Sequence, residues 1–382
     1  MRCTPEAIAA ALGDIDSRNL RRKRELASDG RVNFCSNDYL GLAVDERVSG
    51  AMADAARQLG AGAGASHLIS GHTAEHDALE RELAEFIGRE RALVFSTGYM
   101  ANLGVLSTLA DRRDLLVADE LNHASLIDAA RLVRSASNLR YAHGDARAAT
   151  MLLDTYAPAI VAAGGGAFVV TDGVFSMDGD LAPLPELAGA AAKHAGWLVV
   201  DDAHGLGVVG ATGRGSCELL GLSARAVPVL VGTFGKAFGT FGAFVAGDSD
   251  VIELLIQRAR TYIYTTALPP AVTAATRMAL AIVKEEGWRR EHLNSLISRF
   301  RDGAKVRGLR LMESTTPIQP MILGAAEAAL SASAKLSAAG FRVTAIRPPT
   351  VPQGTARLRI TLSAAHSEAQ IDSLLVALES SI

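Results

Sequence analysis

The segment from Gly232 to Phe244, GTFGKAFGTFGAF, contains a single lysine, Lys236, among glycines and phenylalanines and no acidic residue. Lysine is usually a solvated surface residue, and burying its charge is unfavourable. Two interpretations are open. Lys236 is either a loop lysine that reaches water or an amine kept poorly solvated, so that it can form a Schiff base with a carbonyl compound.

Polar residues suited to the same chemistry follow short apolar runs elsewhere in the chain. Because parallel α/β sheets bind ligands outside the carboxyl ends of their strands, residues directly after such runs are candidates for one site. They are Ser96–Gly104 after 92–95, His123 after 115–118, Ser176 after 167–170, Asp201, Asp202 and His204 after 197–200, and Thr233 and Lys236 after 229–232. Together they suit an aromatic, phosphorylated ligand that bears a carbonyl group.

Pyridoxal phosphate has groups that match these residues. Its aldehyde needs an amine, which Lys236 supplies, and its ring nitrogen needs a fixed carboxylate, which Asp201 provides at a strand end. His204, three residues after Asp201, can reach the phenolic oxygen, and His123 offers a flat partner for the ring. The sequence therefore predicts that Lys236 is the Schiff-base lysine.

The phosphate of this cofactor needs hydrogen-bond donors. Amides near Gly98 and Tyr99 lie at the expected N-terminus of a helix, which favours an anion, and Thr233 adds a hydroxyl group. Taken singly, the candidate residues have plainer interpretations, such as a helix cap, a surface histidine or a packed threonine. Their common position after five strands favours the cofactor.

Composition sets the broad class of protein. The chain has 382 residues, 49% of them hydrophobic, which is enough for two compact domains. A net charge of −3 gives no electrostatic footprint for nucleic acid. Three scattered cysteines, Cys3, Cys35 and Cys217, lack metal-site spacing and indicate a reducing compartment. Without a signal peptide or a membrane span, we expect a soluble cytoplasmic protein with no nucleic-acid or membrane partner.

The elements expected from the sequence form an α/β protein. Thr4 and Pro5 begin a helix with Ile8, Ala11, Leu12 and Ile15 at helical spacing. Apolar runs at 92–95, 115–118, 167–170, 197–200, 229–232 and 243–246 alternate with helical stretches, which indicates a mostly parallel sheet covered on both faces. The glycine-rich stretch LGAGAGASH, 59–67, follows a helical segment instead of a strand, so it is not a dinucleotide-binding loop.

The last hundred residues differ in pattern. RLRITL, 357–362, alternates Leu358, Ile360 and Leu362 with Arg357, Arg359 and Thr361, which predicts a half-polar sheet. A closing helix has Ser367 and Gln370 as a capping box and an apolar stripe at 371, 374, 375 and 378. We expect an N-terminal helix and arm over 1–40, a large domain over 41–280 and a smaller α+β domain over 281–382.

Six motifs, given at the end of this paragraph, resemble those of the α-oxoamine synthases. The resemblance covers the chain from about residue 20 to its end. It implies a fold-type I pyridoxal-phosphate transferase, similar to aspartate aminotransferase, that works as a homodimer with its site at the subunit interface. The motifs are SNDYLGL (36–42), SGHTAEHDALE (70–80), DGVFSMDGD (172–180), VVDDAHGLGVVG (199–210), GTFGKAFGTFGAF and RPPTVPQGTARLRITLSAAH (347–366).

The resemblance implies the following catalytic roles. Lys236 forms the Schiff base and then serves as the general base, and Asp201 pairs with the pyridinium. His204 bonds the ring oxygen, His123 stacks on the ring, and Ser176 lies beside it.

The resemblance also implies the binding residues. Gly98, Tyr99 and Thr233 hold the phosphate, joined by Thr265 or Thr266 from a second subunit. Asn37 and Arg359 bind the amino-acid carboxylate. The residues near the acyl thioester are Arg21, Arg347 and Thr350.

Within this family, the 347–366 motif and LRRKREL (20–26) favour the branch that condenses L-alanine with pimeloyl-CoA or a pimeloyl carrier protein. Alternatives are glycine with acetyl-CoA or succinyl-CoA, serine with a long acyl-CoA, and a regulator without turnover. A nicotinamide-dependent dehydrogenase is disfavoured by the 59–67 loop. The family usually has a glycine where this chain has Ala65, and that substitution bears on the choice of acyl group.

Overall fold

The computed structural model describes residues 4–18, 20–22, 24, 26, 30–133 and 137–382. By its internal contacts the chain divides into two units. The large unit comprises Asn37–Ser176 and Asp180–Glu291, and the small unit comprises Met1–Ser36, Met177–Gly179 and His292–Ile382. The domain bounds that we expected from the sequence stay a prediction. No helix in the described part of the chain is long and apolar enough to cross a membrane.

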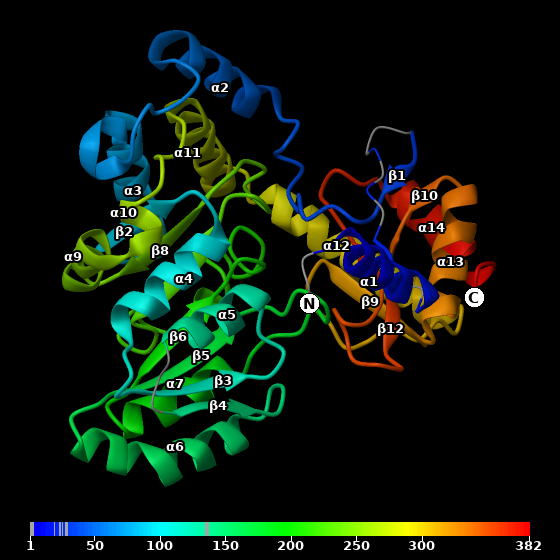
Figure 1. Cartoon of the computed structure of the whole chain (residues 1–382). Coiled ribbons are helices and arrows are strands. Elements are labelled where there is room, and N and C mark those ends of the chain that lie inside the picture. The colour runs from blue at the N-terminus through cyan, green and yellow to red at the C-terminus, as the bar shows by residue number, and fades with distance from the viewer. Residues whose placement is uncertain (1–3, 19, 23, 25, 27–29, 134–136) are drawn as a thin grey trace. The chain divides into compact units, whose positions relative to one another are not determined.

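The large unit is built on a seven-stranded sheet of order β2-β8-β7-β6-β5-β3-β4 (Figure 1). Neighbours from β7 to β4 pair in parallel, whereas β8 is antiparallel to both β2 and β7. The strands are β2 (Arg91–Phe95), β3 (Leu115–Asp119), β4 (Ser137–Tyr141), β5 (Ala167–Asp172), β6 (Trp197–Asp201), β7 (Val229–Thr233) and β8 (Ala243–Gly247). All six apolar runs of the sequence are strands, and the mostly parallel sheet is confirmed.

Helices cover both faces of this sheet. On one face, the core holds Val105 of α4, Leu126 of α5 and Leu255 of α9, and on the other it holds Leu153 of α6 and Leu187 of α7. The helices are α2 (Glu46–Leu59), α3 (Ala74–Ile87), α4 (Gly98–Leu109), α5 (Ala124–Val133), α6 (Ala146–Ala162), α7 (Leu184–Lys193), α8 (Ser216–Leu219), α9 (Ser249–Arg258), α10 (Arg260–Ile263), α11 (Pro270–Glu285) and the π-helical η1 (His67–Gly71). Strands buried on both faces explain why the runs lack alternation.

The small unit contains a three-stranded antiparallel sheet of order β11-β12-β9 and a parallel pair, β1 with β10. The strands are β1 (Val32–Asn33), β9 (Ile318–Gly324), β10 (Phe341–Arg342), β11 (Thr344–Ile346) and β12 (Ala356–Thr361). The helices are α1 (Pro5–Ser17), α13 (Ala326–Ala338), α14 (Glu368–Glu379) and most of α12 (Trp288–Val306).

Helix ends follow the sequence signals. Thr4 caps α1 by accepting a hydrogen bond from the Ala7 amide, and Pro5 takes the first helical position. Ser367 and Gln370 form the predicted capping box of α14, whose apolar stripe is buried. The apolar side chains of α1, by contrast, stay exposed in this chain, with Ile8 at 54%.

The expectation of a half-polar sheet needs correction at β12. Its alternation holds, but both faces are buried, with Arg357 at 4% and Arg359 at 6% exposure. Polar partners make this burial possible. Arg357 forms an ion pair with Asp178 and donates to the Thr355 carbonyl, and Arg359 donates to the Thr361 hydroxyl at 3.0 Å.

Candidate active site

The carboxyl end of β6 holds Asp201, as the sequence predicts. The side chain is 5% exposed and lies opposite Asp172 in the register of β5 and β6. Asp201 accepts hydrogen bonds from the Asn102 side-chain amide at 2.6 Å and from the Ala203 backbone at 3.0 Å. These donors fix the carboxylate in one orientation inside the large unit.

Two further carboxyl groups are buried beside Asp201. Burial, with the nearby Asp201 charge, raises the pKa of Asp172 well above its usual value. Burial also raises the pKa of Asp202 to about 7, although the Ser216 amide donates to Asp202 at 2.6 Å. Each buried negative charge disfavours another, so the ionised Asp201 carboxylate is best stabilised when a cation lies next to it.

His123 follows β3 and lies within the same network. Its backbone amide donates to Asp172 at 2.6 Å, and its Nδ1 atom lies 2.7 Å from the Ser125 hydroxyl. Its ring meets Tyr99 edge-on, with centroids 6.5 Å apart. Desolvation lowers the pKa of His123. The Asp201 charge opposes this effect, and the Lys236 charge adds to it. The histidine is therefore held neutral at physiological pH.

His204 is 6% exposed and contacts Tyr39, which is fully buried. The Tyr39 hydroxyl lies 2.6 Å from His204 Nδ1 and 3.2 Å from the side-chain oxygen of Asn37. The structure thus brings together His204, predicted as a cofactor ligand, and Asn37, predicted as a substrate ligand.

The N-terminus of α4 offers donors for an anion. Thr97 caps this helix by accepting from the Met100 amide, so the amides of Gly98 and Tyr99 have no partner within the helix. A Cβ atom on Gly98 would meet nothing within 4 Å, so the space beside these amides is open. The Tyr99 hydroxyl itself donates to Asp128 on α5.

Lys236 lies in the β7–β8 connection and is half-buried. Three of the four phenylalanines around it form a small core, since Phe234 packs on Phe238 and Phe244 with centroids 6.0 and 5.5 Å apart, whereas Phe241 is exposed. Glycine is required at 232, where a Cβ would lie 2.3 Å from Leu206 Cδ1. The apolar residues of this segment are therefore structural and leave Lys236 as its reactive group.

Of two threonines predicted to bind phosphate, Thr233 has other partners for its hydroxyl group in this structure. Thr233 donates its hydroxyl proton to the Gly242 carbonyl at 3.0 Å and accepts from the Gly235 amide at 3.3 Å. Thr266 is exposed and pairs through its backbone with Ser66. Thr233 must release the Gly242 carbonyl before it can donate to a phosphate.

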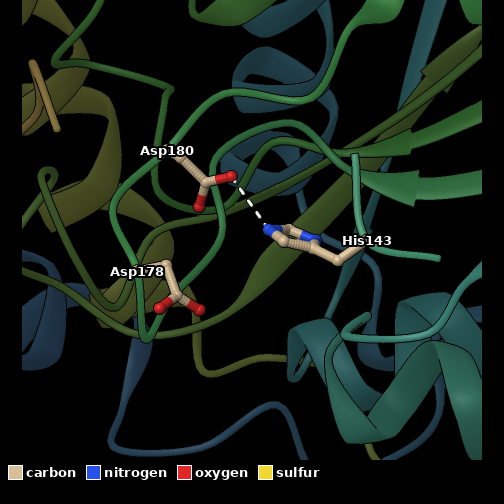
Figure 2. Close-up of side chains that lie close together, drawn as sticks. All are labelled: His143, Asp178 and Asp180. Carbon is tan, nitrogen blue, oxygen red and sulfur yellow. Dashed lines mark hydrogen bonds and ion pairs between the residues drawn. The ribbon is translucent and has the colours of Figure 1, made fainter. Parts of the chain in front are cut away.

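Ser176 lies in a turn that His143 holds in place. The turn is closed by pairing of Val174 with Leu181. His143 Nε2 lies 2.9 Å from Asp180 in this turn (Figure 2). Its Nδ1 atom lies 3.1 Å from Asp119 at the end of β3. Although burial opposes the charge, the hydrogen bonds and negative charges of these two carboxylates raise the pKa of His143 to about 10. His143 is therefore charged at neutral pH and ties the turn to the sheet.

Residues predicted to lie near the acyl thioester belong to the small unit. Arg21 and Arg347 line one cavity of about 820 Å³, together with Arg31 and Arg342. Asp16 faces the same cavity and pairs with Arg21 at 3.0 Å. Among the residues that the structure describes, the cavity lining thus has four guanidinium groups and one carboxylate, which suits an anion.

The remaining predicted residues of the small unit lie elsewhere. Thr350 is exposed, and its hydroxyl group accepts a hydrogen bond from the Arg22 guanidinium at 3.3 Å. Arg359 is buried on β12. Of the cysteines, Cys35 and Cys217 are free, and Cys3 lies outside the described residues, as do Lys23 and Glu25 of the 20–26 motif.

Sequence reasoning missed four residues of the site: Tyr39, Asn102, Ser125 and Asp172. Asp172 ends β5, so the strand-end rule that found Asp201 also applies to it. Asn102 is 1% exposed in the middle of α4. Asparagine is unfavourable in a helix interior, and that is the signal that could have found it.

The large unit fits pyridoxal phosphate in three respects. A buried, doubly hydrogen-bonded carboxylate at Asp201 suits a protonated ring nitrogen. The open helix N-terminus at Gly98 suits a phosphate, and the half-buried amine of Lys236 suits an aldehyde.

Comparisons with known proteins agree with this fit. Residues 29–378 match the family model described as aminotransferase class I and II. The 8-amino-7-oxononanoate synthase of Methylococcus capsulatus is 57% identical over 386 residues, covering 98% of both chains.

Two solved structures have the same fold as this chain. A serine palmitoyltransferase from S. paucimobilis, with a bound PLP–myriocin aldimine, aligns with a TM-score of 0.89 and 31% identity over 99% of this chain and 96% of that one. The 8-amino-7-oxononanoate synthase of Francisella tularensis aligns with a TM-score of 0.79 and 32% identity over 92% and 98% of the two chains. The chain therefore belongs to the α-oxoamine synthases, within the class I and II aminotransferase family, and is a pyridoxal-phosphate-dependent acyltransferase.

Proposed function

We propose that this protein condenses L-alanine with a pimeloyl thioester, with loss of CO₂, to give 8-amino-7-oxononanoate for biotin synthesis. The observation that carries the proposal is the 57% identity to a synthase of that name over nearly the whole length of both chains. Because one fold hosts many functions, the shared fold alone does not identify the substrates. Sequence identity of this degree over the whole chain is the stronger support.

The cofactor, when bound, supplies a carbonyl group for the amine of alanine and a ring that withdraws electrons from its α-carbon. Lys236 first holds the cofactor through Nζ. After release from the cofactor, Nζ would be a free amine able to accept the α-proton of alanine. Asp201 keeps a proton on the ring nitrogen, which maintains the electron withdrawal.

Other residues orient the reactants. With the cofactor bound, His123 would cover one face of its ring as a neutral imidazole, and His204 with Tyr39 would hold its ring oxygen. From the family resemblance, we propose that Asn37 and Arg359 bind the carboxylate of alanine.

The reaction balances without a redox partner. A bond forms between the α-carbon of alanine and the thioester carbonyl carbon, and the carbon–sulfur bond breaks, so the thiol leaves. The α-carboxylate is lost as CO₂, and a proton returns to the α-carbon.

The arginine-lined cavity of the small unit is proposed to bind the anionic parts of the thioester substrate. A pimeloyl group ends in a free carboxylate, and its carrier bears phosphates. Guanidinium groups recognise both through paired hydrogen bonds. Arg21 and Arg347 lie in this cavity, and this supports the roles that the resemblance implies for them.

The test is to incubate the purified protein with pyridoxal phosphate, L-alanine and pimeloyl-CoA and to detect the product by mass spectrometry. Parallel reactions with glycine and acetyl-CoA, and with a pimeloyl carrier protein, identify the preferred pair. Product from alanine and a pimeloyl thioester supports the proposal. Turnover of glycine alone would leave the family intact and overturn the substrates. We also propose that the enzyme is a cytoplasmic homodimer, which sedimentation of the purified protein tests.

A further inference from the structure

Asn102 connects two groups of the site through its side-chain amide. Its Nδ2 atom lies 2.6 Å from Asp201 Oδ2 and 2.8 Å from Ser125 Oγ. An ionised carboxylate only accepts hydrogen bonds, so the atom facing Asp201 must be the nitrogen. Both hydrogens of the amide are then used, one toward Asp201 and one toward Ser125. The orientation of Asn102 is thereby fixed by the charge of Asp201.

The direction of the next hydrogen bond follows from the first. Ser125 Oγ accepts from Asn102 and has one proton left to donate. His123 Nδ1 lies 2.7 Å from this oxygen, and the Ser125 backbone amide also donates to Nδ1, at 3.2 Å. A nitrogen that accepts from two donors carries no proton. The neutral ring of His123 is therefore protonated at Nε2.

These hydrogen bonds form a relay from Asp201 through Asn102 and Ser125 to His123, and its two middle residues are shielded from water, whereas His123 is exposed. Asn102 is 1% exposed and Ser125 is fully buried. The hydrogen bond between Asn102 and Ser125 is therefore stronger than it would be in water, because no solvent molecule competes for its partners. Desolvation lowers the pKa of His123, which agrees with a neutral ring that accepts at Nδ1.

The backbone of His123 is held independently of its ring. Its amide donates to the Asp172 carboxylate. The side chain of the preceding residue, Asn122, makes two hydrogen bonds to the backbone of β5: it accepts from the Asp172 amide at 3.0 Å and donates to the Val170 carbonyl at 2.8 Å. Loss of the Ser125 hydroxyl thus removes the shorter of the two hydrogen bonds to Nδ1, which makes the tautomer protonated at Nδ1 easier to populate, while the loop keeps its anchors.

We propose that Asn102 and Ser125 are positioning residues that run a directed chain of hydrogen bonds from Asp201 to His123, fixing His123 as the neutral tautomer protonated at Nε2. Its consequence for catalysis rests on the proposed function. His123 can then offer a single donor, Nε2–H, to a group that lies at the edge of its ring. The relay also couples the residue at the cofactor nitrogen to the residue that covers the cofactor face.

The test is ¹⁵N NMR of the histidine rings in the holoenzyme labelled with ¹⁵N-histidine. The chain has nine histidines, and a His123→Gln variant assigns the signal. Wild-type protein should show His123 with Nε2 protonated and Nδ1 unprotonated. In Ser125→Ala, the second tautomer should become populated. Ser107→Ala is the matched control, since this serine lies exposed on α4 and bonds only to carbonyls of its own helix. It should leave the His123 signal unchanged.

A second variant keeps the proposal testable where one substitution disturbs folding. Asn102→Ala removes the donor that orients Ser125, and it should move the His123 signals in the same direction as Ser125→Ala. Unchanged signals of the other histidines report an intact fold. Wild-type protein protonated at Nδ1, or both variants with the wild-type tautomer, would overturn the proposal.

A kinetic measurement separates this proposal from the proposed function. Ser125→Ala should lower kcat about 2- to 10-fold, as expected for one hydrogen bond, with little change in the KM for alanine. If the tautomer changes as predicted but wild-type enzyme makes no product from alanine and a pimeloyl thioester, the substrates are wrong and the relay stands.

Discussion

Replacing His143 by glutamine should destabilise the protein in a way that depends on pH. The imidazolium bridges Asp119, which is 1% exposed, and Asp180, whose side chain is 33% exposed. Glutamine keeps a polar group of similar reach but carries no charge. It also loses the edge-on contact with Phe175, whose ring centroid lies 4.4 Å from that of His143.

The magnitude follows from the pKa of His143, which the two carboxylates raise from 6.5 to about 10. A difference of about 3.5 units corresponds to roughly 5 kcal/mol as an upper limit. Asp119 keeps two backbone donors, the amides of Leu121 and Gly144, both at 2.9 Å. The loss is therefore smaller, and we expect about 2–4 kcal/mol near pH 6.5.

The sign of the pH dependence is fixed by the direction of the shift. Because the folded-state pKa lies above the unfolded one, the stabilisation is fully present below about pH 6.5 and is lost as the pH rises to about 10. The difference in free energy of unfolding between wild type and His143→Gln should therefore shrink by up to about 1.4 kcal/mol per pH unit over this range. Other groups that titrate there affect both proteins equally.

Urea denaturation of both holoproteins at pH 6.5, 8 and 9.5, followed by circular dichroism, measures this difference. His194→Gln is a matched control, because the ion pair of His194 is with a single carboxylate, the half-exposed Asp154, and its loss should cost less than about 1 kcal/mol. A difference between wild type and His143→Gln that stays constant with pH would refute the charged bridge. So would a variant as stable as the wild type at pH 6.5.

Two predictions concern the reaction itself. Asp201→Asn should keep cofactor but lower kcat about 100-fold or more, since a neutral amide does not hold a proton on the ring nitrogen; steady-state kinetics measure this, and a mild effect would move the role to Asp202. Arg347→Met should raise the KM for pimeloyl-CoA about 10- to 100-fold and leave that for alanine unchanged. The exposed Arg310→Met is its control, and an equal effect of both variants would contradict the binding role of the cavity.

Much of the large unit was predictable because strands buried on both faces have continuous apolar runs. Asp201, His123 and Lys236 were proposed as site residues because parallel sheets place their ligands beyond strand ends, and the structure has them after β6, β3 and β7. β4, with sequence SNLRY, was missed. It lies at the sheet edge and is buried only at Tyr141, so it lacks an apolar run.

The rest of the site depends on contacts that the sequence pattern does not contain. Tyr39 reaches His204 across 165 positions of sequence, and Asn102 reaches Asp201 across 99. The burial of Arg357 likewise depends on Asp178, a residue 179 positions away. Alternation predicts which face a side chain takes, but whether that face meets solvent or protein is decided by such distant partners.

The measurement that tests the central claim most directly is reduction of the holoenzyme with borohydride, followed by peptide mass spectrometry. Reduction turns a Schiff base into a stable amine, so the cofactor stays on the lysine that bound it. We predict the mass of the reduced cofactor on the peptide that contains Lys236. A modified lysine elsewhere, or no modification after incubation with pyridoxal phosphate, would contradict the assignment of Lys236 as the reactive amine.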